Sequence, residues 1–86
     1  MTQREPARII RDPRICGGDP TVAGTRVPVS SVVIQWHYYQ DFERVQRAFP
    51  RLDIPAIKAA LAFYEDNREE IDRLIEEHER AAYSAD

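Results

Sequence analysis

The stretch that decides the fold lies in the first third of the chain and reads Gly17-Gly18-Asp19-Pro20-Thr21-Val22-Ala23-Gly24-Thr25-Arg26-Val27-Pro28-Val29. It holds all three glycines of the protein and two of its six prolines. Glycine adopts positive φ freely and proline fixes φ at about −65°, so this composition dictates the backbone shape. We expect two short β-capable pieces, Thr21-Val22 and Arg26-Val27, joined by a tight reversal between them.

A second short strand is predicted upstream, at Ile9-Ile10. It ends at Asp12-Pro13, because the residue before a proline avoids the α region. This strand would pair with one arm of the glycine-rich hairpin to make a small sheet. An isolated hairpin is marginal in water, so the sheet must pack against helices or a second subunit. Residues 1–8 are expected to be a flexible arm.

After the hairpin, the spacing of apolar residues becomes helical. A first helix is predicted from Val29, with Ser30 or Ser31 as its cap. A second helix follows the cap residue Asp41 and ends at Pro50. A third follows the cap residue Asp53 and places four apolar residues on its inner face, Ile57, Ala60, Leu61 and Tyr64. The turn between the second and third helices has the length of a helix-turn-helix, so residues 9–66 are predicted to be a mostly α, trihelical domain with a β-hairpin.

The last helix is predicted over 67–80, with a tail that frays over 81–86. Asn67 and Glu70 have the spacing of a capping box. One unbroken helix from Pro55 to about Arg80 is the alternative, but Arg68 and His78 interrupt its apolar seam, which favours a break near Asn67. Four residues line one face of the last helix, Ile71, Leu74, Ile75 and His78. This face either covers the core or binds a groove of a partner protein, and both interpretations stay open.

The net charge of −3 is unevenly distributed along the chain. Residues 1–50 carry seven arginines against five acids, whereas residues 51–86 carry five bases against ten acids. A basic first half suits an anionic partner, and an acidic second half suits a basic protein surface or serves solubility alone. A single cysteine, the polar start of the chain and the lack of a long apolar run predict a cytoplasmic protein without a membrane segment.

The sequence shows no pattern typical of an enzyme. His37 and His78 lie far apart, and neither has the spacing of a zinc site. The segment 17–24 has neither a dinucleotide-binding nor a Walker pattern. Cys16 is either an exposed thiol or, more commonly, a small buried hydrophobe. We therefore expect a non-catalytic protein with no metal and no cofactor.

Nucleic-acid binding is better supported by the distribution of cations. They gather in two groups that are candidates for contacts to DNA phosphates: Arg8, Arg11, Arg14 and Arg26 around the hairpin, and Arg44, Arg47, Arg51 and Lys58 around the helix-turn-helix. The start of the third helix would normally read bases, yet it offers one cation and no Asn, Gln or Arg. The hairpin arginines are therefore better candidates for specific contacts. A trihelical unit used only for packing is the alternative.

Four pieces of this sequence resemble one family, the domain-of-unknown-function four-thirty-three family. They are Ile15-Cys16-Gly17-Gly18-Asp19-Pro20, Gly24-Thr25-Arg26-Val27-Pro28-Val29, Phe49-Pro50 and the predicted helix 57–64. The resemblance covers residues 9–66, and paired signatures at matching spacing make it specific. The motif positions with a structural role are Gly17, Gly18, Pro20, Gly24, Thr25 and Pro28.

The resemblance implies a homeodomain-like helix-turn-helix and the non-catalytic half of a type II toxin–antitoxin pair. Such an antitoxin binds a PIN-like nuclease toxin and binds operator DNA to repress its own transcription. A homodimer is expected, because the hairpin cannot protect its own edges and operators are usually two-fold. One departure stands out: members commonly end the first helix with glycine, whereas this chain has Tyr39-Gln40. A protein-interaction or dimerisation module without a DNA role is the alternative function.

Overall fold

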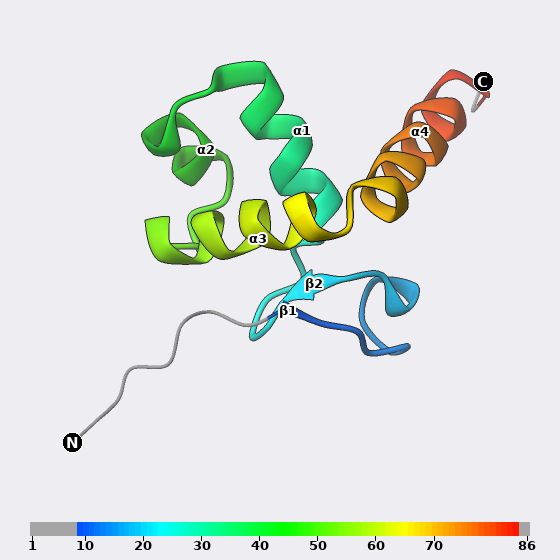
Figure 1. The fold of residues 1–86 in the computed structure, drawn as a ribbon, viewed down its shortest axis with the longest axis horizontal. Coiled ribbons are helices and arrows are strands. Elements are labelled where there is room, and N and C mark those ends of the chain that lie inside the picture. Colours follow the sequence, from blue (N-terminus) through cyan, green and yellow to red (C-terminus); the bar gives the residue numbers. More distant parts are fainter. Residues whose placement is uncertain (1–8, 85–86) are drawn as a thin grey trace.

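The structure is a computed structural model that describes the backbone of residues 9–84 and the side chains of residues 9–80. The flexible arm predicted for residues 1–8, with the candidate Arg8, lies outside the described residues. The chain forms four helices and a small two-stranded sheet (Figure 1). In order, the elements are β1 (Ile9–Ile10), a 3₁₀ turn (Cys16–Gly18), β2 (Thr21–Val22), α1 (Val29–Tyr39), α2 (Phe42–Ala48), α3 (Ile54–Asp66) and α4 (Arg68–Ser84).

The sheet joins β1 to the first arm of the glycine-rich hairpin, as the sequence predicted. The two strands are antiparallel, with Ile9 opposite Val22. Gly24 has φ 81° and closes the reversal, a conformation that an L side chain adopts only at a cost. The second arm of the hairpin is not a regular strand, which corrects the prediction for Arg26-Val27. The N–H of Val27 donates to the Thr25 hydroxyl instead of to Val22, so the ladder does not extend along this arm, which keeps only an isolated bridge between Pro28 and Thr21.

The start of α1 depends on the hairpin. Its first residue, Val29, donates its backbone N–H to the carbonyl of Pro20 at 2.9 Å. The predicted serine cap is wrong, because Ser30 and Ser31 lie inside the helix and Pro28 is the residue that precedes it. Pro28 is extended, with φ −71° and ψ 151°, and its carbonyl accepts the N–H of Ser31. The glycine-rich stretch therefore fixes where α1 begins and in which direction it leaves.

Gln40 ends α1 in the left-handed conformation, with φ 51° and ψ 40°. Its N–H donates to the carbonyl of Trp36 at 2.7 Å, which satisfies one of the last free carbonyls of the helix. Glycine is the usual residue at such a position because it has no Cβ to clash. The chain thus forms at Gln40 a left-handed turn of the kind that glycine usually forms, and it accepts a strained side chain there.

The caps predicted for α2 and α3 are confirmed. The carboxylate of Asp41 accepts the N–H of Glu43 at 3.0 Å, and that of Asp53 accepts the N–H of Ala56 at 2.9 Å. Helices α1, α2 and α3 pack together, and the sheet lies against α3 (Figure 1). The core between them is mostly valine and other aliphatic side chains: Val22, Val29, Val32, Val33, Val45, Leu52, Ala56, Ile57, Ala60, Tyr64 and Ile71.

The chain breaks between α3 and α4 at Asn67, which confirms the predicted break and rules out one continuous helix. The capping box does not form. The side chain of Asn67 donates to the carbonyl of Phe63 at 2.9 Å, so it closes α3 rather than opening α4. Helix α4 extends to Ser84, four residues past the predicted end, and the predicted frayed tail is helical over 81–84. Among the described residues, no helix is both long and apolar enough to cross a bilayer.

Candidate functional site

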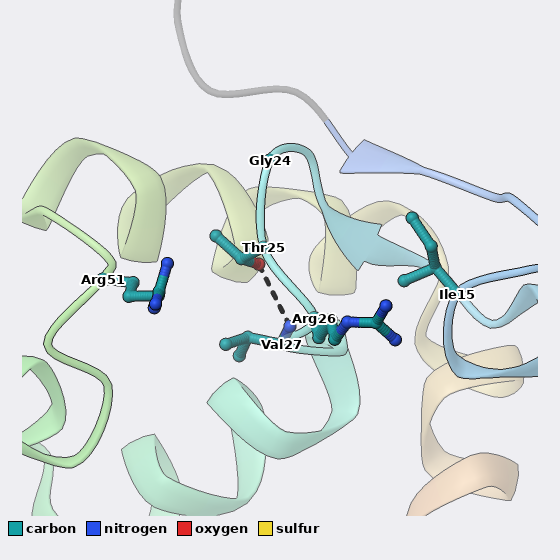
Figure 2. Close-up of a pocket in the computed structure, with 6 residues that line it drawn as sticks. All are labelled: Ile15, Gly24, Thr25, Arg26, Val27 and Arg51. Carbon is teal, nitrogen blue, oxygen red and sulfur yellow. Dashed lines mark hydrogen bonds between the residues drawn. The ribbon is translucent and has the colours of Figure 1, made fainter.

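Two of the predicted cationic residues meet at one hollow on the surface. Arg26 follows the Gly24 reversal, and Arg51 lies in the connection between α2 and α3. Both side chains are exposed, and both line a hollow of about 510 Å³ together with Ile15, Gly24, Thr25 and Val27. Figure 2 shows their guanidinium groups on either side of Thr25 and Val27. The fold thus brings together one arginine of the hairpin and one of the helix pair.

The backbone that carries Arg26 is held in place by short hydrogen bonds. The hydroxyl of Thr25 donates to the carbonyl of Val22 at 2.7 Å and accepts the N–H of Val27 at 3.0 Å (Figure 2). The Cys16 thiol contacts the carbonyl of Arg26 at 3.4 Å, so Cys16 is partly buried against the loop. Among the described residues the Arg26 side chain forms no ion pair, which leaves the guanidinium open to a ligand.

Arg47 extends this cationic surface along α2. It is exposed and lines two further hollows, one of about 390 Å³ beside Tyr39 and one of about 530 Å³ beside Pro50. Among the described residues, no ion pair involves Arg26, Arg47 or Arg51. We call these three residues the open arginines. Their charge is not neutralised within the described part of the chain, so it acts outward on the solvent.

The other two candidates near the helix pair have partners. Arg44 forms an ion pair with Asp41 at 3.9 Å, and its guanidinium lies 5.9 Å from the ring centre of Tyr39. The ammonium of Lys58 lies 5.4 Å from the ring centre of Phe42. Both side chains remain exposed, so these contacts orient the cations and do not remove them from the surface.

Arg11 and Arg14, in contrast, are neutralised by carboxylates. Arg14 donates to both oxygens of Asp12 at 3.1 and 3.0 Å, and these bonds hold the pKa of the Asp12 carboxyl below its usual value. Arg11 donates to both oxygens of Glu70 on α4 and lies 5.6 Å from the ring centre of Phe63. Both arginines are candidates for phosphate contacts, and in the fold each guanidinium is paired with a carboxylate.

The predicted partner-binding face of α4 is only partly exposed. Ile71 is fully buried in the core, so it offers no surface to a partner, and its assignment there is corrected. Leu74 and Ile75 are half-buried against the core, whereas His78 is exposed. The Tyr64 hydroxyl donates to Asp72 at 2.8 Å, which helps to fix α4 on the domain and raises the pKa of Tyr64. The first turns of α4 are therefore structural.

A further surface lies at the C-terminal end of α1. Tyr38 and Tyr39, at the end of α1, are exposed and border a hollow of about 470 Å³ that Ile75 and Glu79 of α4 also line. Tyr38 stands off the helical face formed by Val29, Val32, Val33 and Trp36, and that spacing is the signal that marks it as a surface residue. Among the described residues, no group of three or more His, Cys, Asp and Glu side chains is arranged to hold a metal ion.

These features define a small, mostly helical domain with a two-stranded sheet and a cationic surface formed by the Gly24 reversal, α2 and the turn that follows α2. The sequence profile of the family described as "Protein of unknown function (DUF433)" matches residues 9–64. The chain therefore belongs to the DUF433 family, and the family resemblance seen in the sequence is confirmed. The profile covers β1 to nearly the end of α3, so all of α4 lies beyond it.

Two relatives agree with this assignment. The uncharacterized protein y4eO of Sinorhizobium fredii is 39% identical over 59 residues, which make up 69% of this chain and 27% of that protein. This chain thus spans about a quarter of the length of that relative. A crystal structure of a DUF433 member from Anabaena variabilis matches with a TM-score of 0.72 and 33% identity, over 78% of this chain and 66% of the other.

Proposed function

We propose that this protein is the antitoxin of a type II toxin–antitoxin pair, which binds a PIN-like ribonuclease and binds operator DNA to repress its own transcription. The observation that carries the DNA-binding part is the set of open arginines, Arg26, Arg47 and Arg51, on adjoining elements of the fold. Cationic side chains without carboxylate partners attract a polyanion, because each phosphate contact releases counterions from DNA. The antitoxin role rests on the family resemblance of the glycine-rich stretch.

In this proposal α2 and α3 act as a homeodomain-like helix-turn-helix, joined by the turn at residues 49–53. In that motif the second helix enters the major groove with its N-terminal end. The tip of α3 is poorly suited to base reading, since Asp53 caps it with a carboxylate and Ile54 and Pro55 follow. We therefore assign phosphate contacts to the open arginines, and sequence discrimination to the Gly24 reversal with Arg26 rather than to α3.

The nuclease-binding part is assigned to the C-terminal half of α4, which leads away from α2 and the sheet (Figure 1). Leu74 and His78 are four residues apart and share one helical face. Ile75 turns towards a different face, where it lines the hollow beside Tyr38. Exposed acidic residues lie along α4 itself, and an acidic amphipathic helix suits a groove on a basic protein.

The DNA-binding part is tested with a fluorescent duplex that spans the promoter of the gene for this chain. Binding is measured as anisotropy over a series of salt concentrations for the wild type and for the double variant Arg26→Ala/Arg51→Ala. The wild-type affinity falls steeply with salt, and the double variant has a slope that is shallower by about two, because two phosphate contacts are lost. Arg73→Ala, which removes a single positive charge from α4, is the control and keeps the wild-type slope.

A protein that fails to bind this duplex at low salt contradicts the DNA-binding part. The exposure of Tyr38, at 77%, favours a second candidate function, a protein-interaction module with no DNA role. A wild type without affinity for DNA that still binds a protein partner would establish this second function. The two candidates are therefore separated by the same titration.

A further inference from the structure

The C-terminal end of α1 presents two exposed aromatic rings between two helices of opposite charge. Tyr38 is 77% exposed and Tyr39 is 38% exposed, and their ring centres lie 4.9 Å apart in an edge-to-face arrangement. They are the large hydrophobic side chains most open to solvent among the described residues. We call them the tyrosine pair. In Figure 1 this end of α1 lies between α2 and α4.

The side of the tyrosine pair that faces α4 is a hollow with an acidic rim. Ile34 and Ile75 line the hollow, which measures about 470 Å³, and Glu79 stands at its edge. Glu79 is exposed and forms no ion pair among the described residues. Its neighbour on the helix, Glu76, is paired with Arg80 at 3.8 Å, so Glu79 supplies the unneutralised negative charge of this side.

The side that faces α2 is basic. Tyr39 also borders the hollow of about 390 Å³ that Arg44 and Arg47 line. The guanidinium of Arg44 lies 5.9 Å from the ring centre of Tyr39. The surface therefore has a fixed order from α4 across α1 to α2: a carboxylate, the tyrosine pair, and two guanidinium groups.

We propose that this surface is the interface of a symmetric homodimer, with the tyrosine pair at the two-fold axis. A two-fold rotation about an axis through the centre of such a surface exchanges its two ends. The basic end of one subunit then faces the acidic end of the other, so that Arg44 and Arg47 meet Glu79 of the partner subunit. The Tyr38 rings meet at the axis, each beside the hollow of the other subunit. A surface with this order of charges is complementary to a second copy of itself.

A second copy explains features that a partner of a single charge does not. A purely cationic partner would meet repulsion from Arg44 and Arg47, and a purely acidic partner would meet repulsion from Glu79. The exposed aromatic centre with a polar rim is the usual anatomy of a protein interface. Of the open arginines, Arg47 belongs to this surface, whereas Arg26 and Arg51 lie outside it and stay free for phosphate contacts in the dimer.

A charge exchange across the axis tests the proposal directly, with the dissociation constant of the dimer measured by sedimentation equilibrium. Arg44→Glu and Glu79→Arg each place like charges opposite one another, twice per dimer because of the symmetry. Each single variant weakens the dimer by about tenfold or more. The double variant Arg44→Glu/Glu79→Arg is tighter than either single variant, because opposite charges face one another again at positions 44 and 79, while Arg47 still opposes full recovery.

Controls separate this interface from general effects of charge and folding. Glu77 lies about 200° around α4 from Glu79, so Glu77→Arg makes the same change of charge on another face and leaves the dimer intact. Tyr38→Ala weakens the dimer by about tenfold without any change of charge. Circular dichroism checks that each variant keeps the helical content of the wild type.

A cross-linking measurement gives an independent readout. Tyr38→Cys, made with Cys16→Ser, places one thiol per subunit at the axis, where mild oxidation links two subunits to each other. Glu77→Cys in the same background stays monomeric on a denaturing gel. A wild type that sediments as a monomer at about 1 mM chain overturns the proposal, as does a double charge variant no tighter than the single ones. A dimer without affinity for DNA leaves this inference standing and removes only the proposed function.

Discussion

The guanidinium of Arg11 donates two hydrogen bonds to the carboxylate of Glu70, a residue 59 positions further along the chain. This pair joins the segment after β1 to the first turn of α4, and the same guanidinium lies over the ring of Phe63 near the end of α3. Arg11, predicted from the sequence as a candidate for a DNA contact, thus connects the N-terminal sheet to the last helix. Its partner Glu70 was predicted to form a capping box with Asn67.

Glu70→Gln tests the ion pair between Arg11 and Glu70, because the contribution of this pair to stability depends on pH. Arg11 holds the pKa of Glu70 below the 4.5 of an ordinary glutamate, so the folded state favours the carboxylate. The pair contributes fully to the free energy of unfolding at pH values above the pKa that Glu70 has in the unfolded chain. This contribution is lost as the pH falls through the lower pKa that Glu70 has in the folded state. We expect the variant to be less stable by under about 1 kcal/mol at neutral pH, since solvent screens both side chains. Urea unfolding from about pH 7 to about pH 3 measures the difference, which shrinks towards the acid end.

Glu69→Gln is the matched control for this pair. Glu69 is the neighbouring, exposed residue of the same turn, and it forms no ion pair among the described residues. Its replacement leaves the pH dependence of stability unchanged. A difference between wild type and Glu70→Gln that stays constant down to about pH 3 would mean that Arg11 does not stabilise the Glu70 carboxylate.

Gln40→Gly is expected to stabilise the protein by about 1 kcal/mol. Gln40 has φ 51°, a conformation in which glycine avoids the clash of the Cβ with the backbone. The midpoint of urea unfolding, with an unchanged slope, measures the gain. The same substitution at Gln35, inside α1, has the opposite effect and costs about 1 kcal/mol. A loss of stability in Gln40→Gly would show that the Gln40 side chain stabilises the folded state by more than its left-handed backbone conformation destabilises it.

Asp53→Ala removes the cap of α3 and is expected to cost about 1 kcal/mol, within a range of about 0.5 to 2. The Asp53 carboxylate accepts the N–H of Ala56, and alanine offers no acceptor. Asp53→Asn keeps an acceptor oxygen at the same place and should stay close to the wild type. Thermal and urea unfolding of the three proteins measure these differences. Equal losses in the two variants would assign the effect to the charge instead of the hydrogen bond.

Ile71→Ala is expected to cost about 2 to 5 kcal/mol, because it leaves a cavity in the core. His78→Ala, seven residues along the same helix and exposed, changes stability by less than about 0.5 kcal/mol. Urea unfolding measures both. The contrast divides α4 into a first part that holds the domain together and a second part that is free for a partner. Similar small effects at both positions would show that the first part is not structural.

Much of the fold could be predicted because local signals decide it. Asp41 and Asp53 cap their helices with their own side chains, and Asn67 marks the break before α4. The pairing of Ile9-Ile10 with the glycine-rich hairpin also followed from short-range rules for proline and glycine. The prediction that Ser30 or Ser31 caps α1 was wrong. The helix begins earlier, at Val29, whose backbone N–H donates to the carbonyl of Pro20.

The distribution of the arginines could not be predicted, since it depends on which carboxylate the fold brings near. Arg14 forms an ion pair with the nearby Asp12, whereas Arg11 forms one with Glu70 of the last helix. Asp12 is close in sequence to both Arg11 and Arg14, and nothing local indicates that Arg14 pairs with it while Arg11 pairs with Glu70. The burial of Ile71 likewise depends on how α4 docks, and the pattern along one helix does not reveal whether its apolar face meets the core or a partner.

The most direct test of the antitoxin role is the activity of the PIN-like nuclease that we propose as the partner of this chain. The nuclease is assayed on a fluorescent RNA with increasing amounts of the full chain, and of a chain that ends at Ile75 and so keeps the core residue Ile71. We predict that the full chain stops cleavage near a one-to-one ratio and that the truncated chain does so only at a large excess. Unchanged RNA cleavage with the full chain in excess would contradict the account.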